Sequence, residues 1–228
     1  MNFNFKTLFS TITFLIIGSY VVQGQNAYGN YYTNRNTTDF LSDTRLNMTV
    51  NPDSFDMDLI NAALFHLSNL ERIKEGEKPL DHFLDLEKSA QLHSEEMSKH
   101  NFFSHSNTKN KKHKTPTVRI YLYNDNYRTV GENIVANNLI EYEGETLEYW
   151  RIQKDGEAID VDENDSDLKY TSYLNLAKRL TKQWMNSAPH KKNILSDEFT
   201  LLGCGCALED GEPFTKIKCT QNFGALFD

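Results

Sequence analysis

Three side chains that could do chemistry together, His105, Glu132 and His190, lie far apart in the sequence. No short spacing such as His-Glu-x-x-His joins two metal ligands on one helix. The sequence also has no glycine-rich phosphate loop, and no serine stands in the Gly-x-Ser-x-Gly turn of many hydrolases. Residue types and spacing alone therefore indicate candidate side chains without naming a reaction.

The three cysteines, Cys204, Cys206 and Cys219, all lie near the C-terminal end. Their surroundings predict two antiparallel strands within residues 202–223. A tight turn at residues 211–212 would place Cys204 opposite Cys219, and a pairing shifted by two residues would place Cys206 there instead. In an oxidising compartment one cross-strand disulfide is expected, contributing about 3 kcal/mol. The alternative is three reduced cysteines in the core.

The charge balance excludes some classes of partner. The 228 residues contain 24 Lys+Arg and 32 Asp+Glu, a formal net charge of −8. A nucleic-acid binder needs a basic face to neutralise phosphates, and an acidic surface gains nothing from an anionic membrane. The acidic excess is local, because residues 141–167 hold 11 acidic and 2 basic residues. We therefore expect no nucleic-acid partner.

The N-terminal segment predicts export. Lys6 precedes an uncharged run at residues 8–22, and small residues then precede Gln25, which is typical of a signal peptide at residues 1–24. A transmembrane anchor is the alternative, but the run is shorter than the roughly 20 residues that a bilayer requires. We expect a secreted protein, extracellular or periplasmic, without stable membrane insertion after cleavage. Residues 25–53 are polar and predict a disordered tail or linker.

The folded region is expected at residues 54–228. Apolar spacing predicts helices at 56–73, 83–100 and 170–186, and a short strand at 118–122. His93 lies on the apolar face of the second helix, which favours a core histidine over a metal ligand. Residues 141–167 predict an acidic insertion with a hairpin around Asp155-Gly156.

The order of several short motifs from about residue 57 to 224 resembles the bacterial branch of the CAP superfamily (cysteine-rich secretory proteins, antigen 5, pathogenesis-related group 1), also called SCP-like extracellular domains. Each motif is weak alone, and their order and spacing carry the resemblance. The matching residues are Asn69-Leu70-Glu71-Arg72, Ala90-x-x-His93-Ser94-x-Glu96-Met97, Asn101-Phe102-Phe103-Ser104-His105, Arg119, Gly131-Glu132-Asn133-Ile134, Trp184-Met185-Asn186-Ser187-x-x-His190-x-x-Asn193-Ile194-Leu195, Gly203-x-Gly205 and Thr220-Gln221-Asn222-Phe223-Gly224.

This resemblance implies an α+β fold, an α-β-α sandwich with a small antiparallel sheet between helices. It also implies that His105, Glu132 and His190 converge in one cleft, supported by Asn133 and Ser187. Two imidazoles and a carboxylate could hold a divalent metal such as zinc. Ser187 stands where relatives have a second acidic residue, so a weaker metal site is expected. The alternative is a structural hydrogen-bond cluster.

The function implied by the resemblance is a binding module for a lipid, sterol-like or protein ligand. We expect binding rather than catalysis, because the sequence offers no obvious oxyanion donors. The first alternative is a metal-assisted hydrolase with Glu132 as general base, aided by His105 and His190. The second is a structural or adhesive surface protein. The insertion at 141–167 departs from the family pattern and could gate the cleft or contact a partner.

Overall fold

The computed structural model of the chain describes residues 31–32, 36–141, 169–211 and 214–227. The predicted signal peptide, and all but the first residue of the acidic insertion, lie outside the described residues. Within the described part, no helix is both long and apolar enough to cross a membrane. The principal helices are α3 (Met57–Lys74), α4 (Leu84–Lys99), α5 (Pro116–Tyr121), α7 (Tyr173–Met185) and α8 (Ala188–Leu195).

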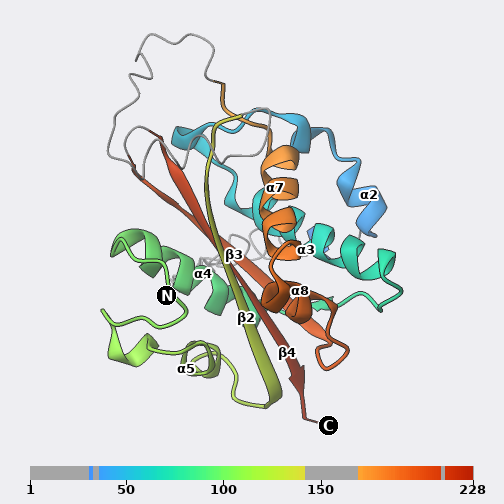
Figure 1. Ribbon diagram of the computed structural model, residues 1–228, viewed down its shortest axis with the longest axis vertical. Helices are drawn as coiled ribbons and strands as arrows, with labels where there is room; N and C mark the ends of the chain where they lie inside the picture. The colour runs from blue at the N-terminus through green and yellow to red at the C-terminus, as the bar shows by residue number, and fades with distance from the viewer. Residues whose placement is uncertain (1–30, 33–35, 142–168, 212–213, 228) are drawn as a thin grey trace, which may run out of the picture.

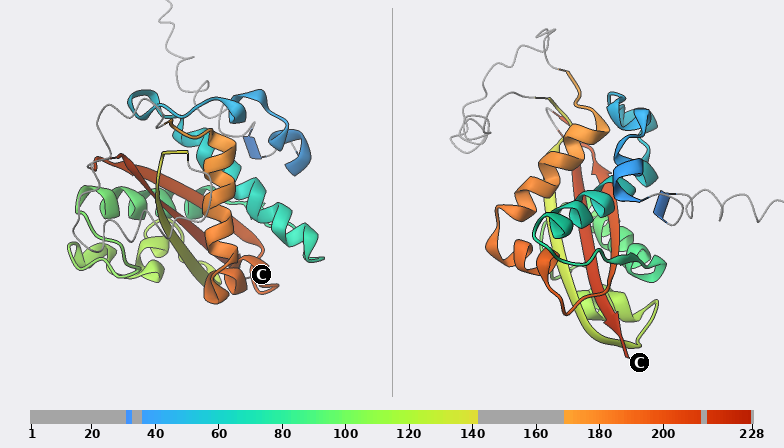
Figure 2. Two further views of the ribbon diagram at one scale, coloured as in Figure 1. Left: turned by 45° about the horizontal axis from the view of Figure 1, so that its top comes forward. Right: turned by 90° about the vertical axis from the view of Figure 1, so that its right-hand side faces the viewer.

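A four-stranded sheet forms the middle layer, in the order β1-β3-β4-β2. Its members are β1 (Asp81–His82), β2 (Tyr127–Asn138), β3 (Leu201–Glu209) and β4 (Lys216–Leu226). The three long strands pair antiparallel, and only the two-residue β1 pairs parallel to its neighbour. Helices cover both faces of this sheet, as Figures 1 and 2 show, which confirms the predicted α+β fold.

Two glycines on β3 bring helix α4 against one face of the sheet. A Cβ atom added at Gly203 would lie 2.1 Å from the backbone nitrogen of Glu87, and one at Gly205 would lie 2.2 Å from that of Gln91. Only hydrogen atoms fit in this space, so the helix backbone can rest directly on the strand. The side chains of Leu202, Cys204 and Cys206 point to the other face, where they join the core formed with α3 and α7.

The disulfide links Cys206 on β3 to Cys219 on β4. The two residues face each other in the strand register, so the pairing shifted by two residues is the correct alternative. Cys204 pairs instead with Gln221 across the strands and is a buried free cysteine. Burial, with a smaller contribution from the nearby Glu87 carboxylate, raises the pKa of the Cys204 thiol far above its ordinary value.

The helix predictions hold where the apolar spacing is regular. Helix α3 begins where the side chain of Asp56 accepts a hydrogen bond from the backbone N–H of Leu59 at 2.9 Å. Helix α7 begins at Tyr173, three residues later than predicted, because Ser172 is its N-cap and accepts from the backbone N–H of Asn175. The tertiary core therefore follows the predicted pattern, with small differences at the ends of helices.

The strand predicted at 118–122 is wrong, because residues 116–121 form helix α5. Thr115 caps this helix by accepting a hydrogen bond from the backbone N–H of Val118, and Pro116 occupies its first turn. Proline is favoured there because its fixed φ suits a helix and its missing N–H would have no helical partner. The local cap signal at 115–116 outweighs the β-branched and aromatic residues that follow.

The tail predicted at 25–53 is wrong for its described residues from 36 onward. They form α2 (Thr37–Leu41) and two 3₁₀ turns, η1 (Thr44–Asn47) and η2 (Pro52–Ser54). Phe40 and Leu46 are fully buried, and Val50 is nearly so, in the same core as α3 and α7. A few apolar residues suffice here because they pack on a core that the rest of the chain already provides.

Candidate functional site

Glu132 lies on β2, the edge strand of the sheet, and its neighbour Asn133 points to the opposite face. On its own face Glu132 meets His105, which follows α4, and Arg119 of α5. On the other face, Asn133 meets α8, which carries His190. The imidazoles of His105 and His190 lie with their ring centroids 6.5 Å apart. The structure thus brings all three predicted residues together, and we call His105, Glu132, His190 and Arg119 the histidine site.

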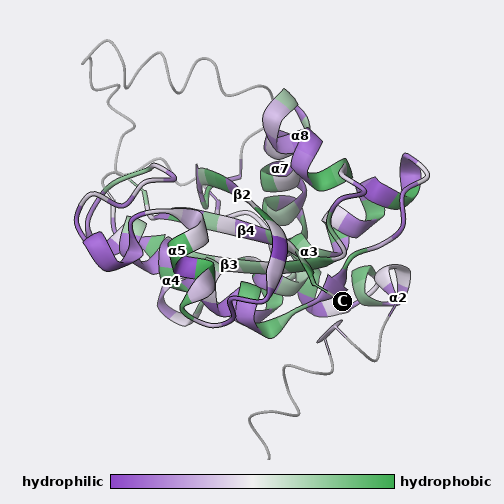
Figure 3. Ribbon diagram, turned by 90° about the horizontal axis from the view of Figure 1, so that it is seen from below, coloured by the Kyte–Doolittle hydropathy of each residue, from purple (hydrophilic) through white to green (hydrophobic). Residues whose placement is uncertain are grey.

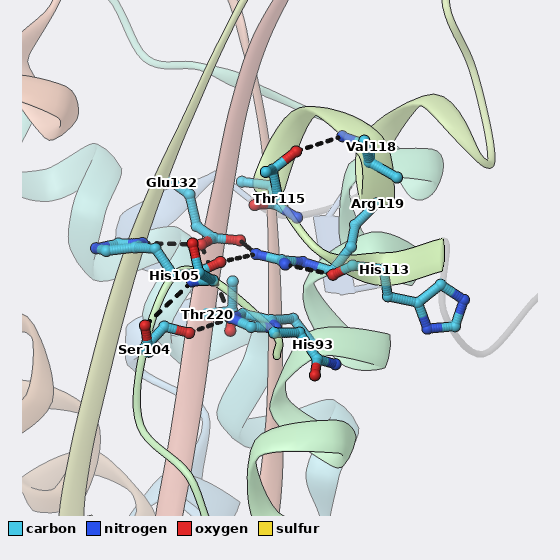
Figure 4. A network of polar contacts seen from close by, with 12 residues as sticks. His93, Ser104, His105, His113, Thr115, Val118, Arg119, Glu132 and Thr220 are labelled. Atoms are coloured by element: carbon cyan, nitrogen blue, oxygen red, sulfur yellow. Dashed lines mark hydrogen bonds and ion pairs between the residues drawn. The ribbon is translucent and has the colours of Figure 1, made fainter. Parts of the chain in front are cut away.

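The carboxylate of Glu132 is buried, with a side chain only 2% exposed, and both of its oxygens accept hydrogen bonds. Arg119 Nη2 donates to Oε2 at 2.7 Å, and His105 Nδ1 donates to Oε1 at 2.8 Å. Arg119 is fully buried, whereas the side chain of His105 is 47% exposed. Figure 4 shows the carboxylate between these partners, with the other ring nitrogen of His105 pointing away from Glu132.

Arg119 also fixes the chain that carries His105. Its Nη2 atom donates to the carbonyl oxygen of His105 at 3.0 Å, and its Nη1 atom donates to that of His113 at 2.9 Å. One guanidinium therefore joins the carboxylate to both ends of the segment from 105 to 113. Because this network is buried and charge-assisted, it holds the His105 backbone in place.

His93 lies beneath the site and is fully buried. Its Nε2 atom donates to the carbonyl oxygen of Ser104 at 3.1 Å and lies 3.8 Å from Glu132. Burial lowers the pKa of His93 to about 4, although the Glu132 carboxylate opposes this shift. His93 is therefore a neutral core histidine rather than the cation of an ion pair, and the prediction from its apolar face is confirmed.

Three amide side chains position His190. Asn133 donates to the carbonyl oxygen of His190 at 3.1 Å, and Asn193 donates to Asn133 Oδ1 at 2.9 Å. Asn133 Nδ2 also lies 3.2 Å from Gln221 Oε1 on β4, so α8 is anchored to two strands. Burial and the neighbouring His105 lower the pKa of His190, which favours its neutral form. Ser187 is the N-cap of α8, without a capping hydrogen bond from its side chain.

The sequence prediction named Arg119 and Asn193 only as parts of the family motifs and assigned neither a role. Both belong to the site, since Arg119 neutralises Glu132 and Asn193 joins Asn133 to α8. Their presence in the motifs was the one available signal, because neither residue is near Glu132 in the sequence.

The arrangement does not fit a metal site in which Glu132 is a ligand. Among the described residues, no group of three or more His, Cys, Asp or Glu side chains could hold a metal ion. Both oxygens of Glu132 already have donors, one of them the cationic Arg119. Glu132 instead has the geometry of a carboxylate that fixes the ring orientation of a ligating histidine. The imidazoles of His105 and His190 are the side chains of the site that remain available as metal ligands.

A cavity of about 690 Å³ lies elsewhere, between α3 and α4. Met57 and Asn61 line it from α3, and Glu87 and Gln91 line it from α4. None of the four histidine-site residues lines this cavity. The chemistry-bearing side chains and this cavity are therefore separate features of the molecule.

The sandwich and the histidine site define the class of protein. The sequence model of the "Cysteine-rich secretory protein family" (CAP) matches residues 65–223, well over half of the chain. The chain therefore belongs to the CAP family, which confirms the resemblance of its motifs.

Two bacterial proteins and one further solved structure are similar to this chain. The Bacillus subtilis (strain 168) protein YkwD is 30% identical over 150 residues, 66% of this chain and 43% of its own length. An extracellular protein containing a SCP domain from Bacillus anthracis str. Ames is 22% identical and has a TM-score of 0.48, covering 78% of this chain and 44% of that one. NaASP2, solved with Zn²⁺, is 14% identical and has a TM-score of 0.38, covering 71% and 78%. The chain thus spans under half of the length of YkwD.

Proposed function

We propose that this CAP protein is a secreted, non-catalytic binding module, and that the imidazoles of His105 and His190 hold a divalent metal ion such as zinc within a site for a lipid or protein ligand. The buried Arg119–Glu132 pair is the observation that carries the proposal. It leaves the histidines as the accessible donors and gives the carboxylate a positioning role.

The same pair argues against the hydrolase alternative. A general base must accept a proton from water or substrate, so it needs a free lone pair within reach of that proton. Glu132 is almost completely buried, and each of its oxygens faces a donor on Arg119 or His105. A bound metal would act as a Lewis acid at the histidines. No described feature would then supply the base, so binding is the better-supported function.

The state of His105 also suits ligand binding. Because its Nδ1–H donates to Glu132, a neutral ring presents Nε2 as an acceptor or metal ligand. His190 favours the neutral form because burial and His105 lower its pKa. Two imidazoles in one place suit zinc, and two ligands should bind it more weakly than the usual three or four.

Secretion is part of the proposal and rests on the sequence. Lys6, the uncharged run at 8–22 and the small residues before Gln25 support cleavage after residue 24. N-terminal sequencing of the protein recovered outside the producing cell tests this directly. A mature chain that begins at Gln25 is expected. Recovery only in the cytoplasm, with Met1 retained, would contradict secretion.

Zinc titration by calorimetry, together with the unfolding free energy, tests the site. One zinc ion should bind per chain, and it should raise the unfolding free energy by about 2.7 kcal/mol at a hundredfold excess over Kd. His105→Ala and His190→Ala should each abolish stoichiometric binding. His100→Ala, which removes an exposed histidine outside the site, is the matched control and should bind like the wild type.

Three results would each overturn a part of this proposal. Zinc binding that persists in the His105→Ala, His190→Ala double variant would place the metal elsewhere. Zinc-dependent hydrolysis of a peptide or ester, lost in Glu132→Gln but kept in His100→Ala, would show that the protein is an enzyme. A screen of lipids and cell-wall fragments against the wild type and the double variant tests the ligand. Identical ligand binding by the wild type and the double variant would show that the two histidines take no part in ligand recognition.

A further inference from the structure

One part of the chain has a charge opposite to the whole. Residues 97–124 contain six Lys and Arg residues and no Asp or Glu, whereas the complete chain has a net charge of −8. Four of the six form a compact group that we call the basic turn, namely Lys109, Lys111, Lys112 and Lys114. All four are exposed, and none forms an ion pair with another described residue. This surface therefore carries uncompensated positive charge.

A buried glutamate gives the basic turn a defined shape. Glu96 of α4 accepts hydrogen bonds from Asn107 at 2.6 Å, from Asn110 at 3.0 Å and from His113 at 2.5 Å. Burial opposes ionisation of Glu96, but the bonds from His113 and Asn110 outweigh it, so its pKa lies below the ordinary value. The polar residues of this loop thus turn inward to one carboxylate. The lysines between them remain in solvent.

An exposed apolar group follows directly in the chain. Val118, Tyr121, Leu122 and Tyr123 are 41%, 43%, 51% and 39% exposed, and we call them the apolar ridge. They lie on α5 and just after it, whereas Arg119 and Ile120 of the same helix are buried. The side chain of Arg119 donates a hydrogen bond to the carbonyl oxygen of His113, which ties the ridge to the basic turn. Figure 1 shows the turn η3 (Lys111–His113) beside α5, and Figure 3 shows both hydrophobic and hydrophilic residues along α5.

We propose that the basic turn and the apolar ridge together form a docking surface for an anionic lipid membrane. Lysines attract acidic headgroups, and tyrosine and leucine side chains gain from entering the interface between headgroups and acyl chains. A soluble acidic polymer would be attracted by the lysines alone and would leave the ridge in water. The juxtaposition of both groups therefore favours a lipid surface. This role is peripheral docking and is independent of metal binding at the histidine site.

The acidic total does not oppose this docking. Charges in solution are screened over about 8 Å at physiological salt, so a membrane responds to the residues nearest to it rather than to the sum. Three acidic residues lie near this surface. Glu96 is paired with His113, the exposed Glu95 lies near Tyr123, and Asp125 follows the ridge in the sequence. The four lysines of the basic turn outnumber the two of these, Glu95 and Asp125, that are not paired with His113. The expectation that an acidic protein gains nothing from an anionic membrane holds for the average surface and fails for this one.

Vesicle co-sedimentation of the purified full chain tests the proposal. The protein should bind vesicles of equimolar phosphatidylglycerol and phosphatidylcholine, and bind vesicles of pure phosphatidylcholine much less. Each lysine near such a surface contributes about fivefold to partitioning. A variant with all four lysines of the basic turn changed to Gln should therefore bind about six hundredfold more weakly. Leu122→Ser should weaken binding about fivefold, because half of a leucine side chain is transferred.

Matched controls exclude general effects of charge and hydrophobicity. Changing the exposed Lys169, Lys178, Lys182 and Lys192 to Gln removes the same charge elsewhere and should reduce binding much less. Ile73→Ser removes an apolar side chain of similar exposure, 48%, and should leave binding unchanged. Every variant keeps the same N-terminal segment, so any affinity of that segment for lipid is the same in all of them and cancels in the comparison.

A fluorescent label reports which surface meets the membrane. Leu122→Cys and Ile73→Cys can each carry an environment-sensitive dye, while the fully buried Cys204 resists labelling. The dye at position 122 should shift to the blue with anionic vesicles, and the dye at 73 should not. Equal shifts at both sites, or full binding by the four-lysine variant, would overturn the proposal. Binding that needs the lysines, ignores Leu122→Ser and is displaced by soluble polyglutamate would overturn it in favour of an acidic polymer.

Discussion

Replacing Arg119 with Met should destabilise the protein by about 4 kcal/mol. The change removes the charge of a fully buried side chain and keeps most of its volume. It leaves the carboxylate of Glu132, 2% exposed, without the partner that stands 2.7 Å away. Removing one member of a buried ion pair typically costs about 3–5 kcal/mol, because the other charge stays desolvated. The bonds from Arg119 to the carbonyls of His105 and His113 are lost as well.

Urea unfolding monitored by circular dichroism measures this loss, and two further variants separate its causes. Glu132→Gln combined with Arg119→Met removes both charges, so the double variant should be more stable than Arg119→Met alone. Arg128→Met changes an exposed arginine on the same strand as Glu132 and should stay within about 0.5 kcal/mol of the wild type.

The refuting result is a loss below about 1 kcal/mol for Arg119→Met with an unchanged urea slope. Such a loss would mean that Glu132 is solvated or finds another donor without cost. The positioning role assigned to Glu132 would then fail, and with it the argument against a general base.

Two further predictions test the packed core of the protein. Gly205→Ala should lower the unfolding free energy in urea by about 3 kcal/mol, because its Cβ would lie 2.2 Å from the backbone of Gln91. Gly131→Ala is the control and should cost about 1 kcal/mol, because its Cβ meets the movable ring of Phe199, and equal losses would contradict the close approach of α4. The pKa of His93 is about 4 in the folded protein against an ordinary 6.5, so the folded state binds fewer protons and stability falls as the pH drops from 6.5 towards 4. This difference in the pKa of His93 corresponds to about 3 kcal/mol of unfolding free energy, so His93→Gln should show a flatter pH profile of that free energy than the wild type. Parallel profiles would show that other groups cause the acid sensitivity.

The parts of the fold that the sequence predicts well are those set by local spacing. The apolar repeat of α3 gives both its length and its buried face, and Asp56 marks its start. The alternation along β3 predicts which side chains share a face, and so limits the disulfide to two registers. The choice between these registers depends on the length of the turn, which local patterns near a glycine and a proline do not determine.

Long-range packing explains the errors. Phe40 and Leu46 stand in a polar segment whose composition predicts disorder, and they order it by entering a core built from residues far along the chain. The same limit applies to the site, because His105 and Glu132 are 27 positions apart and meet only after β2 takes the edge of the sheet. The family resemblance predicted that these residues meet, which spacing alone could not do.

The role of Glu132 illustrates how one local error changes a chemical conclusion. With residues 118–122 as a strand, nothing in the sequence indicates that Arg119 reaches Glu132, and a carboxylate beside two histidines then resembles a metal ligand or base. In helix α5, Arg119 and Ile120 turn inward while Val118 and Tyr121 turn outward. The inward face neutralises Glu132 and makes it an orienting group for His105. The outward face is the apolar ridge. Both proposals for this protein therefore depend on the same helix. Arg119→Met removes the bonds to Glu132, His105 and His113, so it should weaken the histidine site and loosen the basic turn, while the side chains of the ridge stay exposed.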